Sequence, residues 1–136
     1  MACQRVTVIE HHLSASPTMA SGSPGPLTTH ILDTASGSPA ANVPILLYKE
    51  ASSSWTLIAE GSTNSDGRCP GLLTQSEFTA GTYKIHFNTK AYFNSLGIKG
   101  FYPYVEVVFE IERPLEHYHV PLLLSPFAIL RTVEVE

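Results

Sequence analysis

The amino-acid sequence predicts one all-β domain with a sandwich architecture. The chain has 136 residues, which is within the common size of a single domain, about 100–150 residues. From residue 26 onward, short segments that alternate apolar and polar residues are separated by turns rich in Gly, Pro, Asn and Asp. Only one short segment has a helical pattern, so the chain lacks the regular alternation of strands and helices that is typical of a parallel α/β fold.

The first strand is expected at residues 27–33, where Leu27, Thr29 and Ile31 lie on one face and the residues between them lie on the other. The Gly and Pro residues of segment 36–42 end this strand. Further strands are expected in five segments, namely residues 43–50, 55–63, 81–88, 104–112 and 117–125. The first two of these five are expected to pair as a hairpin across a short Ser-rich turn.

The segment 64–71, NSDGRCPG, separates the hairpin from the later strands. Its Asp66-Gly67 pair is typical of a turn, because both residues accept backbone conformations that most side chains avoid. Arg68 follows this turn directly, so we expect it on a loop or on a very short edge strand.

Residues 89–97, TKAYFNSLG, are expected to form the one short helix of the domain. Either Asn88 or Thr89 can cap its first turn, since both side chains accept hydrogen bonds from free backbone N–H groups. Gly97 is expected to close the helix, as glycine commonly does.

The N-terminal segment, residues 1–25, is predicted to be a flexible leader, and the folded domain to span residues 26–136. Residues 14–26 are almost all Ser, Pro, Gly and Ala, a composition that buries too little apolar surface to order itself. The leader also resembles the type-2 peroxisomal targeting signal at four positions, namely Arg5, Val6, His12 and Leu13. We therefore expect a peroxisomal import receptor as a partner and the peroxisome as the location. Met19 offers an internal start that would omit this signal.

Composition and charge exclude several classes of function. The net charge is −4 and no basic stripe is present, so a nucleic-acid partner is not expected. No apolar run approaches the roughly 18 residues that a membrane helix needs. Cys3 and Cys69 show neither a CxxC motif nor metal-ligand spacing, which favours reduced thiols in an intracellular protein.

The histidines on the predicted strands differ in their surroundings. His86 alternates with apolar neighbours and is expected to face solvent. His119 shares its face with His117, Pro121 and Leu123, an apolar surface that a lone monomer is not expected to show to water. His30 lies on the face opposite Ile31 in the first strand. From the residues alone, these positions fit either ordinary surface side chains or an interface or ligand site between subunits.

Five segments in order resemble the transthyretin-related family, and more narrowly its hydroxyisourate-hydrolase branch: PLTTHILDTASGSPA, TNSDGRCPGLL, GTYKIHFNTKAYF, FYPYVEVVF and HYHVPLLLSP. Together they span residues 26–126. The resemblance implies a transthyretin-like (prealbumin) sandwich of two four-stranded sheets with one short helix. It also implies dimers made by edge-strand pairing, and a homotetramer in which two dimers meet back to back around a central channel.

The resemblance further implies a catalytic and substrate-binding set formed by His30, Arg68 and His119. The implied reaction is the hydrolysis of 5-hydroxyisourate to 2-oxo-4-hydroxy-4-carboxy-5-ureidoimidazoline, after urate oxidase in purine catabolism. Lactam opening needs a base for water, a proton donor for the leaving nitrogen and a cation for the developing oxyanion. Two imidazoles and a guanidinium supply these groups, although the sequence does not decide which histidine is the base. No cofactor and no metal are expected.

The sequence also leaves two other functions open. One is a transthyretin-like carrier of small aromatic ligands in the channel between dimers, and the other is a structural sandwich without chemistry. The hydrolase branch differs from the carrier at the positions of His30, Arg68 and His119. A carrier is also expected to have a secretory signal, whereas residues 1–25 resemble a peroxisomal targeting signal.

The C-terminal residues 128–136 depart from the family that the chain resembles. After Leu-Ser-Pro that family continues with an aromatic residue and ends on Tyr-[Ser/Thr]-Thr-Tyr-Arg-Gly-Ser, whereas Phe127 is followed here by AILRTVEVE. When the codons from Ala128 onward are read from their third base, permitted choices spell Tyr-Ser-Thr-Tyr-Arg-Gly-Ser and a stop. We therefore expect that a frameshift produced this tail. Its residues still alternate, so we expect a final strand, with Glu134 and Glu136 near the active site.

Overall fold

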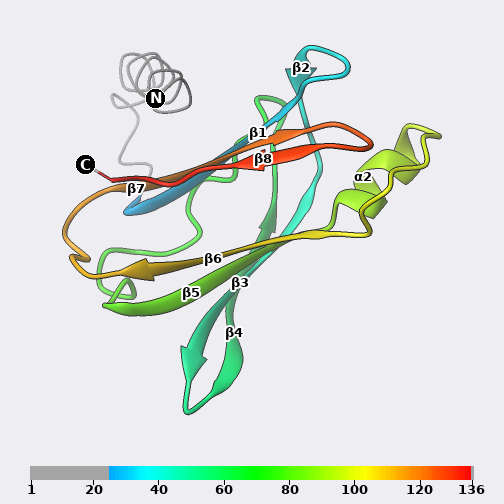
Figure 1. Cartoon of the computed structure of the whole chain (residues 1–136). Helices are drawn as coiled ribbons and strands as arrows, with labels where there is room; N and C mark the ends of the chain where they lie inside the picture. The colour runs from blue at the N-terminus through cyan, green and yellow to red at the C-terminus, as the bar shows by residue number, and fades with distance from the viewer. Residues whose placement is uncertain (1–24, 136) are drawn as a thin grey trace.

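The computed structural model describes residues 25–135, which form two sheets packed face to face with one short helix at an end of the sandwich (Figure 1). The first sheet has the strand order β2-β1-β7-β8, with β9 also paired to β7, and the second has the order β4-β3-β5-β6. The strands of the first sheet are β1 (Leu27–Asp33), β2 (Ser38–Pro39), β7 (Tyr118–Leu124), β8 (Ile129–Arg131) and β9 (Glu134–Val135). Those of the second are β3 (Pro44–Ala51), β4 (Ser54–Ser62), β5 (Gly81–Phe87) and β6 (Val105–Ile111). The predicted all-β sandwich is confirmed.

The centre of the first sheet is the parallel pair of β1 and β7. Its register runs from Leu27 opposite Tyr118 to Asp33 opposite Leu124. The two-residue strand β2 was not expected from the sequence, because its Ser and Pro look like turn residues. It nevertheless pairs with the last two residues of β1 and extends the sheet edge.

The tail forms the last strand positions of this sheet, as predicted. β8 pairs antiparallel with β7, and β9 pairs with the beginning of the same strand. The two segments share one register, since Leu122 faces Arg131 and His119 faces Glu134. Ile129 packs against the core. Glu136, the second acid expected near the site, lies outside the described residues.

The second sheet confirms the predicted hairpin, since β3 and β4 pair antiparallel with one bulge between Leu47 and Tyr48. The helix α2 (Thr89–Ser95) begins after Asn88, whose side chain accepts a hydrogen bond from the N–H of Ala91. Asn88 is therefore the cap, and Gly97 follows the helix with a φ of 72°. The hydroxyl of Tyr92 donates to Asp33 at 2.7 Å and ties the helix to the end of β1.

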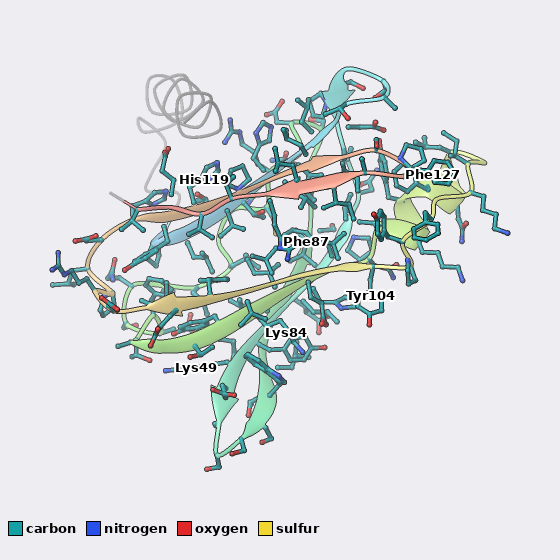
Figure 2. The ribbon with its side chains drawn as sticks, viewed as in Figure 1. Lys49, Lys84, Phe87, Tyr104, His119 and Phe127 are labelled. Carbon is teal, nitrogen blue, oxygen red and sulfur yellow. The ribbon has the colours of Figure 1, made fainter. Side chains whose placement is uncertain are left out.

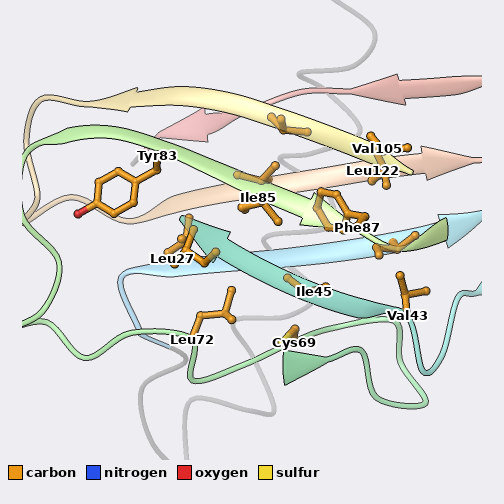
Figure 3. Packing of buried hydrophobic residues seen from close by; sticks show 14 of the residues in the cluster. Leu27, Val43, Ile45, Cys69, Leu72, Tyr83, Ile85, Phe87, Val105 and Leu122 are labelled. Atoms are coloured by element: carbon orange, nitrogen blue, oxygen red, sulfur yellow. The ribbon is translucent and has the colours of Figure 1, made fainter. Parts of the chain in front are cut away.

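The core lies between the two sheets and is built from the inward-facing residue of every second strand position (Figure 3). Figure 3 shows Leu27 and Leu122 of the first sheet facing Ile85 and Phe87 of the second, and Ile31 of β1 belongs to the same cluster. All five are fully buried, and each such side chain contributes roughly 1.5–3 kcal/mol relative to an exposed position. Because the alternate positions are committed to this core, the residues between them face outward.

Two further observations concern the cysteines and a possible membrane span. Cys69 is a free, buried cysteine, and Cys3 lies outside the described residues. Within residues 25–135, no helix has both the length and the apolar character that a membrane span requires.

Candidate active site

The structure brings His30 and His119 together on the outer face of the first sheet. In the parallel register of β1 and β7, Thr28 lies opposite His119, and His30 lies opposite Pro121. These four residues share one face because paired residues of neighbouring strands point to the same side. Figure 2 places His119 on the strand at the side of the sandwich away from the second sheet.

β7 is an inner strand of its sheet, with β1 on one side and β8 and β9 on the other. The side chain of His119 is only 5% exposed, Pro121 is buried and Leu123 is half-buried. This apolar face is therefore largely sheltered from water within the single chain. His119 has a sheltered environment, flanked by β1 on one side and by β9 on the other.

Arg68 reaches the same site from the other side of β1. It forms an isolated antiparallel bridge with His30, so the two side chains leave the backbone toward the same face. Asn64 builds the supporting turn, because its side-chain oxygen accepts hydrogen bonds from the N–H groups of Asp66 and Arg68, at 2.9 and 3.1 Å. The N–H of Ile31 donates to the carbonyl of Gly67 at 2.8 Å and attaches the turn to β1. The prediction that Arg68 lies on a loop or very short edge strand is confirmed.

Gly67 lets this turn approach β1 so closely. Its φ is +76°, and a Cβ atom there would lie 2.4 Å from the carbonyl oxygen of Ile31. We expect Gly67→Ala to lower the free energy of unfolding by about 3 kcal/mol or more, because the strain of a left-handed alanine, about 1–2 kcal/mol, adds to this clash. Gly71→Ala is the matched control, since Gly71 has a φ of +72° with nothing within 4 Å of the added atom.

Urea unfolding followed by circular dichroism measures both variants. Gly71→Ala should lose only the conformational strain, about 1–2 kcal/mol. Equal losses in the two variants would show that the turn is not held against β1 as described.

The electrostatics of the site favour a neutral His30 beside a charged Arg68. Burial, followed by the positive charge of Arg68, lowers the pKa of His30 from 6.5 to about 4. Burial also lowers the pKa of Arg68, while the nearby carboxylate of Asp66 opposes that shift. An arginine nevertheless keeps its charge at any physiological pH. At neutral pH the site therefore presents an uncharged imidazole next to a fixed cation.

Sequence reasoning did not single out two polar residues that the structure adds to the site. Oγ1 of Thr28 lies 2.7 Å from Nδ1 of His119 and 3.1 Å from Nε2 of His117. Nδ1 of His117 in turn lies 3.1 Å from the carbonyl oxygen of Gly25. The alternation of residues along the two strands could have indicated both residues, because Thr28 shares a face with His30 and His117 shares a face with His119.

The tail supplies a further group, since Glu134 of β9 lies directly opposite His119. Cross-strand partners of an antiparallel pair have Cβ atoms about 4.5–5.5 Å apart. The site thus runs across the sheet from a cation at Arg68, through the two imidazoles, to a carboxylate on the tail. His86 does not belong to it. As predicted for an outward-facing residue, its ring lies on the second sheet, where Nδ1 is 3.0 Å from Glu106.

This arrangement can polarise water and stabilise an oxyanion in a partly dry setting. A neutral imidazole accepts a proton from water near neutral pH, and a guanidinium holds negatively charged oxygens through several N–H donors. In residues 25–135, no group of three or more His, Cys, Asp or Glu side chains is placed to hold a metal ion.

Comparison with known proteins identifies the family. A family model described as HIUase/Transthyretin family matches residues 27–130. The chain belongs to the HIUase/Transthyretin family. The match begins with β1 and ends inside β8, so it includes the positions of His30, Arg68 and His119 and stops before Glu134.

Relatives in the HIUase/Transthyretin family include both kinds of protein that its description names. The chain is 52% identical over 105 residues to 5-hydroxyisourate hydrolase of Mus musculus, covering 76% of this chain and 89% of the mouse protein. It is 39% identical over 116 residues to 5-hydroxyisourate hydrolase of Salmonella typhi, covering 85% of each. Sea bream transthyretin in complex with thyroxine matches with a TM-score of 0.78 and 38% identity, covering 82% of this chain and 96% of that chain. The predicted transthyretin-like sandwich is confirmed.

Proposed function

We propose that this protein hydrolyses 5-hydroxyisourate by opening its lactam ring. The observation that carries the proposal is the common outer face of β1 and β7, where His30 and His119 lie together and Arg68 is bridged to His30. Support also comes from the mouse relative named 5-hydroxyisourate hydrolase, which is 52% identical to this chain. The product would be 2-oxo-4-hydroxy-4-carboxy-5-ureidoimidazoline, and the reaction belongs to purine catabolism.

Each group has a distinct task in this reaction. Arg68 holds the ring oxygens of the planar, electron-rich substrate and stabilises the oxyanion that forms when water attacks the carbonyl carbon. His119 takes the proton from that water, because its imidazole lies in a hydrogen-bonded chain that can accept one. His30 is neutral at working pH, since its pKa is about 4. It therefore orients the substrate or water through hydrogen bonds and adds no second positive charge.

The proposal is tested by adding purified protein to freshly generated 5-hydroxyisourate and following the loss of its ultraviolet absorbance. The uncatalysed decay, measured without protein, is subtracted. Saturable acceleration that scales with protein concentration supports the hydrolase. A decay rate equal to the uncatalysed one would refute it and favour a sandwich without chemistry.

The competing function is a carrier of small aromatic ligands, because the sea bream transthyretin structure contains thyroxine. Charged and hydrogen-bonding groups at His30, Arg68 and His119 favour chemistry over storage of an apolar ring. A carrier would bind thyroxine at equilibrium without accelerating the decay of hydroxyisourate, so calorimetric titration with thyroxine separates the two functions.

The assembly that we propose is a homotetramer formed from two dimers. β6 is an edge strand of the second sheet, and Val108 in its middle is 58% exposed. The backbone N–H and C=O groups along an edge strand can pair with the same strand of another copy. In such an assembly, the outer faces that carry His30 and His119 would line the channel between dimers.

We also propose that the protein acts in peroxisomes and is imported by the receptor for the N-terminal signal. The residues of that signal, Arg5, Val6, His12 and Leu13, lie outside the described residues, so this proposal depends on the sequence pattern alone. A fluorescent reporter fused behind residues 1–25 should enter peroxisomes, and the Arg5→Ala, His12→Ala double variant should stay cytosolic. The control exchanges Gln4 and Glu10, which the pattern leaves free. Import of the double variant at the normal level would refute the signal.

A further inference from the structure

Four groups on the outer face of the first sheet form one continuous chain at hydrogen-bond distances. The chain runs from Nδ1 of His119 to Oγ1 of Thr28 over 2.7 Å, and from Oγ1 to Nε2 of His117 over 3.1 Å. It ends where Nδ1 of His117 meets the carbonyl oxygen of Gly25 at 3.1 Å. The parallel register that places Thr28 opposite His119 holds these groups in line.

The direction of each hydrogen bond follows from the last acceptor. A carbonyl oxygen only accepts, so Nδ1 of His117 must carry a hydrogen. When His117 is neutral, its Nε2 then has a lone pair and accepts the single hydroxyl hydrogen of Thr28. The Thr28 oxygen can therefore only accept from His119, whose Nδ1 carries the hydrogen. The chain thus leaves the lone pair of neutral His119 on Nε2, the nitrogen that can act as a base.

Protonation of His117 reverses this order. Both ring nitrogens of an imidazolium are donors, so Nε2 of His117 then donates to Thr28. The hydroxyl of Thr28 must turn and donate to Nδ1 of His119, whose hydrogen now lies on Nε2. His119 thereby changes from a hydrogen-bond acceptor to a donor at Nε2 without any movement of its ring.

We propose that Thr28 and His117 are positioning residues that form a proton relay behind His119 and switch it between base and acid within one catalytic cycle. The catalytic part of this inference rests on the hydrolase function proposed above. It assigns the division of labour between the two site histidines, with His119 as the base and His30 as an orienting group.

The proton balance of the cycle closes. Water loses a proton to Nε2 of His119 as its oxygen forms a bond to the carbonyl carbon. The Nδ1 proton of His119 passes to Thr28, and the hydroxyl proton of Thr28 passes to Nε2 of His117, which becomes an imidazolium. The ring C–N bond then breaks, the leaving nitrogen takes the proton from Nε2 of His119, and the relay runs back until His117 is neutral. The net change is the addition of one water across the amide bond.

Charged groups from each neighbouring element bear on this relay. Glu134 faces His119 from β9 and favours positive charge on the relay. Arg68 and Asp66, on the far side of β1, act on His30 with opposite signs, and the pKa of His30 is lowered to about 4. Glu116, next to His117 in sequence, is paired with Arg113 at 3.4 Å.

Nuclear magnetic resonance of the ligand-free protein tests the relay without any substrate. Long-range ¹⁵N–¹H correlation spectra distinguish the two tautomers of each imidazole. At mildly alkaline pH, where an ordinary imidazole is neutral, we expect both His117 and His119 as Nδ1–H tautomers. Finding either ring as the Nε2–H tautomer under these conditions would overturn the proposal.

Kinetics test the catalytic part with a matched pair of variants. Thr28→Val keeps the shape and the strand preference but removes the hydroxyl, and we expect kcat to fall about 10–100-fold while KM changes little. The acid limb of its pH–rate profile should also change, because the charge on His117 no longer reaches His119. Thr28→Ser restores the hydroxyl and is expected to recover most of the activity and the normal profile. Urea unfolding verifies that both variants fold, and His117→Gln provides a second interruption of the chain.

The outcomes separate this inference from the proposed function. If the wild-type protein turns over hydroxyisourate and Thr28→Val matches it in kcat and pH profile, the relay is wrong and the hydrolase stands. If the wild-type protein shows no turnover, the hydrolase is wrong, and the catalytic role of the relay fails with it. In that case the tautomer spectra still decide whether the hydrogen-bond chain has the stated direction.

Discussion

Substituting any one of the three site residues is expected to abolish most of the turnover while the sandwich stays folded. We expect His119→Asn, His30→Asn and Arg68→Ala each to lower kcat/KM by about a hundred- to ten-thousandfold. His119→Asn removes the proposed base, Arg68→Ala removes the cation proposed to stabilise the oxyanion, and His30→Asn removes a neutral imidazole from the same face. All three side chains lie on the outer face, so none of these changes opens a cavity in the apolar core.

The kinetic constants should separate the roles. Loss of the base lowers kcat with little change in KM, whereas loss of Arg68 weakens substrate binding as well and raises KM. Arg68→Lys keeps the charge but loses the forked donor geometry, so its activity should lie between those of Arg68→Ala and the wild type.

His86→Asn is the matched control for the histidine variants. His86 also lies on an outer strand face and is hydrogen-bonded to Glu106, but it belongs to β5 in the other sheet. Its replacement should leave kcat/KM unchanged. Near wild-type turnover in any of the three site variants would remove that residue from the mechanism, and a comparable loss in His86→Asn would show that the losses reflect general damage.

The sequence predicted the elements of this fold well because local patterns determine them. Alternation located β1 and β7 to within one residue, and the Asn88 cap with Gly97 located the helix. The strand β2 was not predicted, because two residues are too few to show an alternation of apolar and polar side chains and its Pro is typical of a turn. The pairing of β1 with β7 joins residues about ninety positions apart, and no local pattern encodes such a contact.

The candidate site was predicted in part for the same reason. Resemblance to the family supplied His30, Arg68 and His119, and alternation placed the two histidines on outward faces. The contacts that order the site depend on register, which only the folded chain provides. Thr28 lies opposite His119 because of this register, so its contact with that histidine emerges only from the structure. The sequence had already predicted Glu134 near the site, and the register adds that it faces His119 directly.

Restoring the family ending is expected to raise activity, because the present tail places a carboxylate opposite His119, the proposed base. The variant replaces residues 128–136 by Tyr-Ser-Thr-Tyr-Arg-Gly-Ser. Its fold should survive, since the replacement again follows β7 at the sheet edge where β8 and β9 now pair. Its kcat/KM should exceed that of the present chain. Equal activity of the two proteins would show that the tail has no functional consequence.

The origin of the tail is decided separately by its coding DNA. A frameshift requires codons whose shifted reading spells Tyr-Ser-Thr-Tyr-Arg-Gly-Ser and a stop, for example a third base of T in the codon for Ala128. Codons that do not permit this reading would refute the frameshift, whatever the two proteins do in an assay.

A single substitution, Glu134→Gln, isolates the charge from the rest of the tail. Glu134 lies opposite His119, and its carboxylate oxygens are buried. Unit charges at 4 Å interact by about 1 kcal/mol in water and about 4 kcal/mol in a typical protein surface environment. The carboxylate favours the protonated form of His119, which cannot act as a base, and it repels the oxyanion. Its neutralisation should therefore raise kcat/KM by at least about fivefold, which corresponds to about 1 kcal/mol.

The sign of the pH dependence distinguishes this effect from a change in packing. Removing a negative charge makes His119 lose its proton more readily, so the acid limb of the pH–rate profile should move to lower pH. High ionic strength should reduce this gain in kcat/KM only in part, because salt screens partly buried charges less than exposed ones. Glu110→Gln is the control, because Glu110 is an exposed acid of β6 in the other sheet, and it should leave the profile in place. An acid limb that stays in place or moves to higher pH in Glu134→Gln would show that the tail carboxylate does not act on the base.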